Sequence, residues 1–201
     1  MKYPFFASFI VFCLWLMYEI HKHRNMDEKN FKAYIDEEVK ANNTRKKPLD
    51  DLQYITIPID SLPTNILKNN TIISDFIDTI YYLSENPIVN LTGISNTELK
   101  LRYGAPNLEL LTQYDTAYTT LVRTLYEWGK ALYENGYSAD AKTVLEYAVS
   151  IKTDVSDTYL TLAKIYSEED NKDKIKELIS DASEINSLMS KTIINKLESF
   201  L

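Results

Sequence analysis

The carboxyl-terminal third of this chain contains an internal repeat whose period is 34 residues. Seven positions of the first copy return in the second copy with a similar apolar, aromatic or small residue. Their spacing of three or four residues predicts helices with one buried face. Such a repeat constrains the fold, because each copy is a helical unit that must pack on a neighbour to bury that face. The paired positions are Leu125 and Tyr159, Trp128 and Leu162, Gly129 and Ala163, Leu132 and Tyr166, Ala141 and Ile175, Leu145 and Ile179, and Ala148 and Ala182.

The period and the residue types resemble the tetratricopeptide repeat (TPR), whose pattern is W-x2-L-G-x2-Y, then A-x3-F, then a small residue. The resemblance is confined to about residues 122–187. Trp128 stands where Leu is usual, Ile175 stands where Ala is usual, and Thr153 or Ser187 replaces the closing Pro. The resemblance implies an all-α fold, a TPR-like stack of helical hairpins that binds other polypeptides. The alternative interpretation is an ordinary antiparallel helical bundle.

In TPR arrays, ligands usually lie against the first helix of each hairpin. The resemblance therefore implies a binding surface on the first helices of the two repeats, where aromatic and basic side chains would suit an extended peptide or a carboxyl terminus. The alternative is a solvated helix face without a ligand. The implied partner-binding residues are Arg123, Tyr126, Lys130 and Tyr133 from the first repeat, and Leu160, Lys164 and Ser167 from the second.

Two repeats are fewer than the roughly three that a stable stack needs, so other segments must cover its ends. Residues 107–187 are predicted to form the two TPR-like hairpins, beginning with a long helix from Leu108 to Glu134. Residues 188–201 are predicted to form a capping helix, whose apolar face consists of Ile193, Ile194, Leu197 and Leu201. The residues predicted to cap helices with a side-chain oxygen are Asn107, Ser138, Ser156 or Asp154, and Asp170 or Asn171.

Residues 49–106 are predicted to supply an extended segment and a helical cover for the first hairpin. Pro58 and Pro63 interrupt an alternating run in which Ile55, Ile57 and Ile59 share one side, so this part lies on the body as extended chain. A following helix of about four turns has an apolar face, and a short helix after it begins at Ser95, three residues before Glu98, and closes at Gly104. The face of the longer helix contains Ile73, Phe76, Ile77, Ile80, Tyr81 and Leu83 or Ser84.

An apolar run near the amino terminus predicts a transmembrane anchor. Residues 3–18 carry no charge, and with Glu19 and Ile20 they are just long enough to cross a hydrocarbon core of about 30 Å. The alternatives are a cleaved signal peptide, which would need small residues at its cleavage site, and a buried core helix. Residues 1–24 are therefore assigned as anchor and flank, and the lysines and arginine that follow the span favour a cytoplasmic body.

Residues 25–48 form a charged linker or an amphipathic helix, in which Phe31, Tyr34, Ile35 and Val39 recur at helical spacing. The segment ends in the basic cluster 45–47, which falls short of the four to eight charges that typically bind anionic lipid. A solvated linker is the favoured interpretation, and contact with lipid headgroups is the alternative.

The remaining composition argues against several functions. Residues 1–48 carry nine Lys or Arg and six Asp or Glu, a net +3, whereas residues 49–201 carry thirteen and twenty-three, a net −10. Such an acidic body disfavours nucleic acid. Cys13 is the only cysteine, the histidines are confined to positions 21 and 23, and the four glycines are too scattered for a phosphate loop. We therefore expect no cofactor, no metal, no small-molecule substrate and no enzyme activity; a hydrolase using acidic side chains is the least favoured alternative.

The sequence thus predicts a membrane-tethered module that recruits a protein or peptide. The alternative is a passive structural subunit, or a homo-oligomer, whose repeat surface is permanently buried. A recruiting surface should carry mixed charged and aromatic side chains, whereas a permanent interface should be apolar at its centre.

Overall fold

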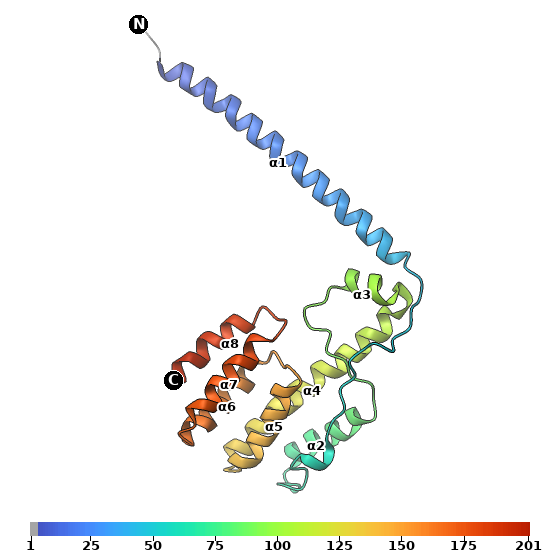
Figure 1. The fold of residues 1–201 in the computed structure, drawn as a ribbon, viewed down its shortest axis with the longest axis vertical. Coiled ribbons are helices and arrows are strands. Elements are labelled where there is room, and N and C mark those ends of the chain that lie inside the picture. The colour runs from blue at the N-terminus through green and yellow to red at the C-terminus, as the bar shows by residue number, and fades with distance from the viewer. Residues whose placement is uncertain (1–3) are drawn as a thin grey trace. The chain divides into compact units, whose positions relative to one another are not determined.

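The computed structural model describes residues 4–201, except the side chains of residues 4, 5, 7 and 23–28. The described chain is all-α, as predicted (Figure 1). Its only β-type pairing is an isolated antiparallel bridge between Tyr54 and Val89. The helices are α1 (Pro4–Asn42), α2 (Thr71–Ser84), α3 (Asn96–Tyr103), α4 (Leu108–Glu134), α5 (Ser138–Ser150), α6 (Ser156–Glu168), α7 (Lys172–Ser183) and α8 (Ser190–Leu197), with short 3-10 turns at Ile59–Ser61, Ala105–Asn107 and Glu198–Phe200.

The chain divides into two compact units. One contains residues 1–47 and 95–108, and the other contains residues 48–94 and 109–201. The short helix α3 therefore groups with the amino-terminal segment, whereas the sequence boundaries placed it with the cover of the first hairpin.

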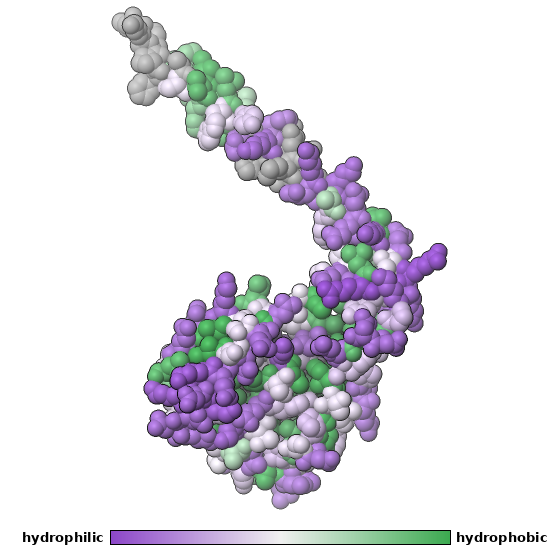
Figure 2. Space-filling model, in the orientation of Figure 1, coloured by the Kyte–Doolittle hydropathy of each residue, from purple (hydrophilic) through white to green (hydrophobic). Residues whose placement is uncertain are grey.

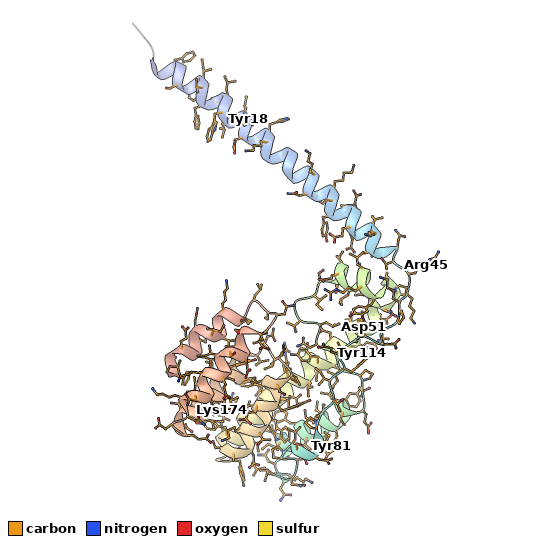
Figure 3. The ribbon with its side chains drawn as sticks, viewed as in Figure 1. Tyr18, Arg45, Asp51, Tyr81, Tyr114 and Lys174 are labelled. Atoms are coloured by element: carbon orange, nitrogen blue, oxygen red, sulfur yellow. The ribbon has the colours of Figure 1, made fainter. Side chains whose placement is uncertain are left out.

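Helix α1 is continuous for 39 residues and passes through position 24 without a break. Its first part exposes many large apolar side chains, seen as the green surface in Figure 2. Tyr18, labelled in Figure 3, is an exposed aromatic residue of the same part. Among the described residues, no helix combines the length and the apolar character that crossing a membrane requires. Residue 3 and the side chains of residues 4, 5 and 7, which belong to the predicted anchor, lie outside the described residues.

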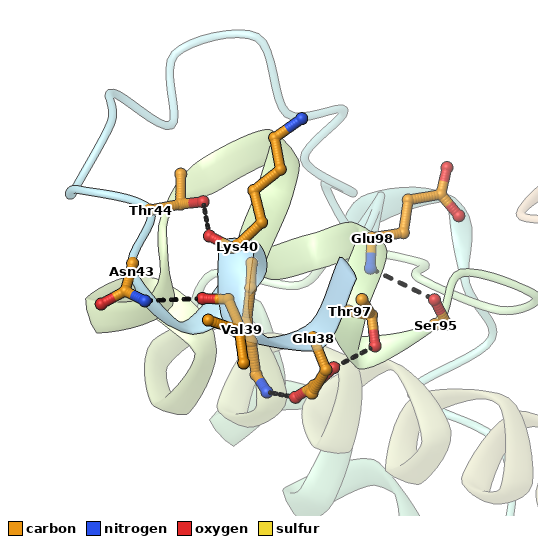
Figure 4. A network of polar contacts seen from close by, with 9 residues as sticks. Glu38, Val39, Lys40, Asn43, Thr44, Ser95, Thr97 and Glu98 are labelled. Atoms are coloured by element: carbon orange, nitrogen blue, oxygen red, sulfur yellow. Dashed lines mark hydrogen bonds and ion pairs between the residues drawn. The ribbon is translucent and has the colours of Figure 1, made fainter. Parts of the chain in front are cut away.

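The carboxyl end of α1 packs against α3. The Glu38 carboxylate accepts hydrogen bonds from the Thr97 hydroxyl at 2.6 Å and from the Lys100 ammonium (Figure 4). The bond from Lys100 is the main reason that the pKa of Glu38 lies below its ordinary value, and the Thr97 bond adds to it. Ala41 and Leu99 are buried in the same unit. The junction therefore combines a small apolar contact with a charge-assisted one.

The predicted boundaries of α3 are confirmed in detail. The Ser95 hydroxyl accepts a hydrogen bond from the Glu98 amide, and Gly104 has a φ of 93°. A Cβ at Gly104 would lie 2.2 Å from the Arg45 carbonyl oxygen, so the close approach itself requires glycine. The Asn107 side-chain amide donates to the carbonyls of Lys47 and Tyr103 at 2.8 and 2.7 Å. Its capping of the next helix, which would use the side-chain oxygen, stays a prediction.

The core of the second unit begins with the extended segment and α2. Ile57 is buried, and Ile55 and Ile59 pack beside it, as their alternation predicts. The Asn70 side chain caps α2 by accepting from the amides of residues 72 and 73. The predicted face of α2 is largely confirmed, with Ile73, Ile77, Ile80 and Leu83 buried. Tyr81 does not belong to that face, because it lies at the edge of the stripe and remains 45% exposed.

Helices α4 and α5 form one hairpin and α6 and α7 form another, and α5, α6 and α7 lie side by side (Figure 1). Of the fourteen positions that recur at the 34-residue offset, thirteen are buried and Ile179 is half-buried. A Cβ at Gly129 would lie 2.6 Å from Leu145 Cδ2, so α4 and α5 touch where Gly129 lacks a side chain. The period therefore marks the residues at which the helices pack.

Two of the predicted helix caps are wrong. Ser138 and Ser156 are the first helical residues of α5 and α6, and neither preceding residue makes a side-chain cap. The Ser156 hydroxyl is buried without a hydrogen-bond partner among the described residues. Asn171 does cap α7, by accepting from the Lys174 amide at 3.2 Å. A serine near the start of a helix can stand at the capping position or one residue inside the helix. The sequence alone does not distinguish these two cases.

The carboxyl terminus covers the last hairpin. Helix α8 packs on α6 and α7 and buries Ile193 and Leu197, with Ile194 half-buried. Leu201 was expected on the same face, but it is 46% exposed. The helix tightens into a 3-10 turn over residues 198–200, and Phe200 packs against the core instead. The changed rotation per residue takes Leu201 off the buried stripe.

Tyr118 connects two loops to the middle of α4. Its side chain is buried, and its hydroxyl donates to the carbonyls of Lys152 at 2.9 Å and Ile151 at 3.2 Å. The same hydroxyl accepts a bond from the Asn90 side-chain amide at 2.9 Å. Burial is the largest cause of the raised pKa of Tyr118, so the group remains a neutral donor.

We expect Tyr118→Phe to lower the free energy of unfolding by about 1–3 kcal/mol, because it leaves buried polar partners without their hydrogen bond. Denaturant titration of the full chain measures the loss. Tyr137→Phe is the matched control, since the Tyr137 side chain is partly exposed and hydrogen-bonds to none of the described residues, and it should change stability by less than about 0.5 kcal/mol. Equal stability of the two variants would contradict this role of Tyr118.

Candidate functional site

The predicted partner-binding residues lie on α4 and α6, and we call their surface the repeat face. Arg123, Lys164 and Ser167 are exposed, and the other four residues are half-buried. Leu160 packs partly against the core. The repeat face consists of Arg123, Tyr126, Lys130, Tyr133, Leu160, Lys164 and Ser167.

The first group on the repeat face is local to α4. The Lys130 ammonium lies over the Tyr126 ring, 5.9 Å from its centroid. This is a cation–π distance, and the two residues are one helical turn apart. Burial is the largest cause of the raised pKa of Tyr126, while Lys130 acts in the opposite direction and Asp157 of α6 adds to the rise. An acidic side chain outside the predicted set therefore acts on this pair.

The second group joins α4 to α6. The Lys164 ammonium lies 5.0 Å from the centroid of the Tyr133 ring, and the Tyr133 hydroxyl donates a hydrogen bond to the Glu168 carboxylate. This bond is the largest cause of the raised pKa of Tyr133, followed by burial. Glu168 was missed by the sequence reasoning, although its position four residues after Lys164 places it on the same side of α6.

The structure does not bring all seven predicted residues together. Arg123 and Ser167 have exposed side chains that form no hydrogen bond or ion pair with any described residue. The face is thus two aromatic–cation groups with separate polar residues around them. It carries charged side chains and tyrosines and has no apolar centre.

A hollow that the sequence did not predict lies between α5, α6 and α7. Its volume is about 380 Å³, and we call it the acidic groove. Val149, Leu162 and Leu178 supply buried apolar lining. Figure 3 labels one of its rim residues, Lys174, on α7. The charged and aromatic lining consists of Glu146, Lys152, Tyr166, Lys174, Glu177, Asp181 and Glu184.

The two lysines of the acidic groove are already paired. Lys174 pairs with Glu177, and Lys152 pairs with Glu184 at 3.2 Å. Glu146 accepts a hydrogen bond from the Tyr166 hydroxyl at 2.7 Å, which adds to the effect of burial in raising the pKa of that tyrosine. The Asp181 side chain forms no hydrogen bond or ion pair with any described residue. Burial is the largest cause of the raised pKa of Asp181, Glu184 and Glu177 add to the rise, and Lys174 and Lys152 act in the opposite direction.

Counting the charged residues in the sequence could not predict the acidic groove. Glu177, Asp181 and Glu184 follow one another at intervals of four and three residues, so they share a side of α7. The same spacing describes any solvated helix face, and only the packing of α5, α6 and α7 together hollows this one. Among the described residues no cluster has the composition of a metal site.

A comparison with models of known protein families found no match, and comparisons with curated proteins and with solved structures also found none.

We expect Glu168→Gln to lower the pKa of Tyr133 toward the ordinary tyrosine value, because the substitution removes the carboxylate that opposes ionisation of the phenol. An NMR titration of the tyrosine ring carbons, with the Tyr133 signal assigned through Tyr133→Phe, measures the change. Glu134→Gln removes a neighbouring charge on α4 and is the matched control, which should leave Tyr133 unchanged. A Tyr133 pKa that is the same in all three proteins would show that the Glu168 contact is absent in solution.

Proposed function

We propose that this protein is a membrane-tethered interaction module that recruits a protein or peptide partner through the repeat face. The observation that carries the proposal is the pair of tyrosine–lysine groups on α4 and α6, formed by Tyr126 with Lys130 and by Tyr133 with Lys164. Tyrosine is a frequent binding hot spot, because its ring supplies a large contact area and its hydroxyl supplies hydrogen bonds.

The arrangement of the helices supports a TPR-like assignment. Thirteen of the fourteen recurring positions are buried, and α8 packs on the second hairpin as a capping helix would. Small residues let the helices approach closely, as Gly129 does against Leu145. A stack of this kind places the first helices of successive hairpins side by side, so that their outer residues form one continuous binding surface.

The side chains of the repeat face favour a reversible partner over permanent burial. Arg123 and Lys164 are exposed, and acidic side chains act on both tyrosines of the face, Glu168 on Tyr133 and Asp157 on Tyr126. Burying such charges in a permanent interface would be costly unless each found a partner. The passive structural subunit therefore remains the second candidate, and the first experiment below discriminates between the two.

The tether is proposed to be residues 3–20. Within the described part of this segment, Phe9, Leu14 and Met17 all expose more than half of their side-chain surface, and a hydrocarbon environment would cover them. Helix α1 then continues to Asn42 in the charged region. The cationic residues that follow the segment favour a body on the cytoplasmic side.

The combined variant Arg123→Ala, Tyr126→Ala and Lys130→Ala should lose partners that the unmodified protein retains through affinity purification. Removing a hot-spot aromatic residue costs about 2 kcal/mol or more, so at least a tenfold loss of bound partner is expected. The matched control is Lys68→Ala, Tyr82→Ala and Lys176→Ala, which removes one exposed tyrosine and two exposed lysines elsewhere. If the face variant folds and keeps every stable partner, the passive-subunit reading replaces the recruiting one.

Leu14→Lys should shift the protein out of the membrane fraction, because a cation in the middle of a span costs about 2.5–3.5 kcal/mol. Deleting residues 1–24 should release it completely. Phe31→Lys, which alters an exposed apolar residue of α1 outside the proposed span, is the control and should remain membrane-bound. Persistence of the deletion variant in the membrane fraction would refute the anchor, and resistance of the body to external protease in intact cells would support the cytoplasmic side.

A further inference from the structure

The acidic groove does not end at α5 and α7. A second hollow, of about 510 Å³, shares Ser150, Lys152 and Glu184 with it. This second hollow is lined by the extended residues 53–56 and by Ile185, among others. A third hollow, also about 510 Å³, shares Thr92, Ile185 and Asn186 with the second. The three hollows adjoin one another at these shared residues, and together we call them the furrow.

The walls of the furrow are fixed by hydrogen bonds. The Ile55 amide donates to the Ile88 carbonyl at 2.9 Å, and the Tyr147 hydroxyl donates to the Thr56 carbonyl at 3.3 Å. The Asn186 side chain donates to the Thr92 carbonyl at 3.2 Å. A preformed wall lowers the entropic cost of binding. A long open depression with rigid sides suits an extended polypeptide better than a compact small molecule, which a single enclosed pocket would bury more completely.

The acidic end of the furrow determines which side chain it accepts. Its floor is apolar, because Val149, Leu162 and Leu178 are buried there. Above this floor, neither Glu146 nor Asp181 forms an ion pair with a described residue, since the two lysines of the rim pair with Glu177 and Glu184. Lys174 acts on both carboxylates from a greater distance, and the groove still holds more acidic than basic side chains. An aliphatic stem ending in a cation matches both parts, with the stem on the apolar floor and the charge at the carboxylates. The Tyr166 ring on the same floor offers a further contact for a cation.

We propose that the furrow binds an extended peptide segment bearing lysine or arginine, whose basic side chain enters the acidic groove between Glu146 and Asp181. The occupant is a segment of another protein with a basic character, and charge complementarity selects it. Figure 2 shows hydrophilic residues gathered over the carboxyl-terminal helices, where these carboxylates belong. The proposal does not use the repeat face, so it stands or fails independently of the function proposed above.

The test measures binding of a short fluorescein-labelled peptide of alternating lysine and glycine to the full chain in detergent, by fluorescence anisotropy. The furrow variant is Glu146→Gln with Asp181→Asn. The matched control is Glu109→Gln with Asp78→Asn, which neutralises two exposed carboxylates outside the furrow. We expect at least a tenfold weaker affinity for the furrow variant and less than a twofold change for the control. A peptide of alternating glutamate and glycine should not bind.

Each other outcome overturns the proposal. Equal losses in both variants would mean that the peptide is attracted by the acidic surface as a whole. Unchanged affinity in the furrow variant would mean that the groove does not bind it, and loss only in the Arg123, Tyr126 and Lys130 variant would place the peptide on the repeat face. Circular dichroism of every variant establishes folding, and because all four substitutions replace partly or fully exposed carboxylates with their amides, the fold should be retained.

Discussion

The second unit depends on how closely α4 approaches α5. At Gly129 a single methyl group would overlap the Leu145 side chain, so that side chain packs directly on the backbone of α4. Trp128 and Leu132 are then fully buried beside that contact, and α6 packs next to α5. The same arrangement repeats 34 residues later with Ala163 in place of Gly129. Both the repeat face and the furrow follow from this spacing, because it determines which sides of α4, α5, α6 and α7 are exposed.

Two hairpins leave two open ends, and the chain closes them by different means. Helix α8 covers one end with an apolar face, as a terminal cap does in a repeat array. The other end is met by the extended segment and α2, whose isoleucines join the same core as the hairpins. Tyr118 ties this cover to the loop between α5 and α6 through hydrogen bonds of its hydroxyl. The two hairpins therefore share one core with segments that are not repeats.

The sequence predicted the helices well where burial alone decides them. The long helix from Leu108 to Glu134 has the predicted bounds, and Ser95 and Gly104 delimit α3 as expected. The errors arise where geometry beyond the regular helix decides, as where Leu201 leaves the buried face at a 3-10 turn. On the repeat face, the residues were predicted from the TPR resemblance, but the bond from Tyr133 to Glu168 depends on the distance between α4 and α6. The acidic groove could not be predicted from the sequence for the same reason, since its carboxylates line one hollow only after the helices pack.

Because α1 is uninterrupted, the rotation of its side chains about the helix axis is fixed along its whole length. A helix turns by about 100° per residue, so every side chain between Pro4 and Asn42 has a fixed angular position relative to every other. Glu38, which is held by Lys100 and Thr97, fixes the rotation of α1 about its axis relative to α3. The directions in which Phe9, Phe31 and Ile35 point are thereby linked to the orientation of α3. Adding or removing one residue within α1 would swing its amino-terminal half through more than a quarter of a turn about its own axis. The number of residues in α1 thus determines the direction in which its side chains point as well as the length of the helix.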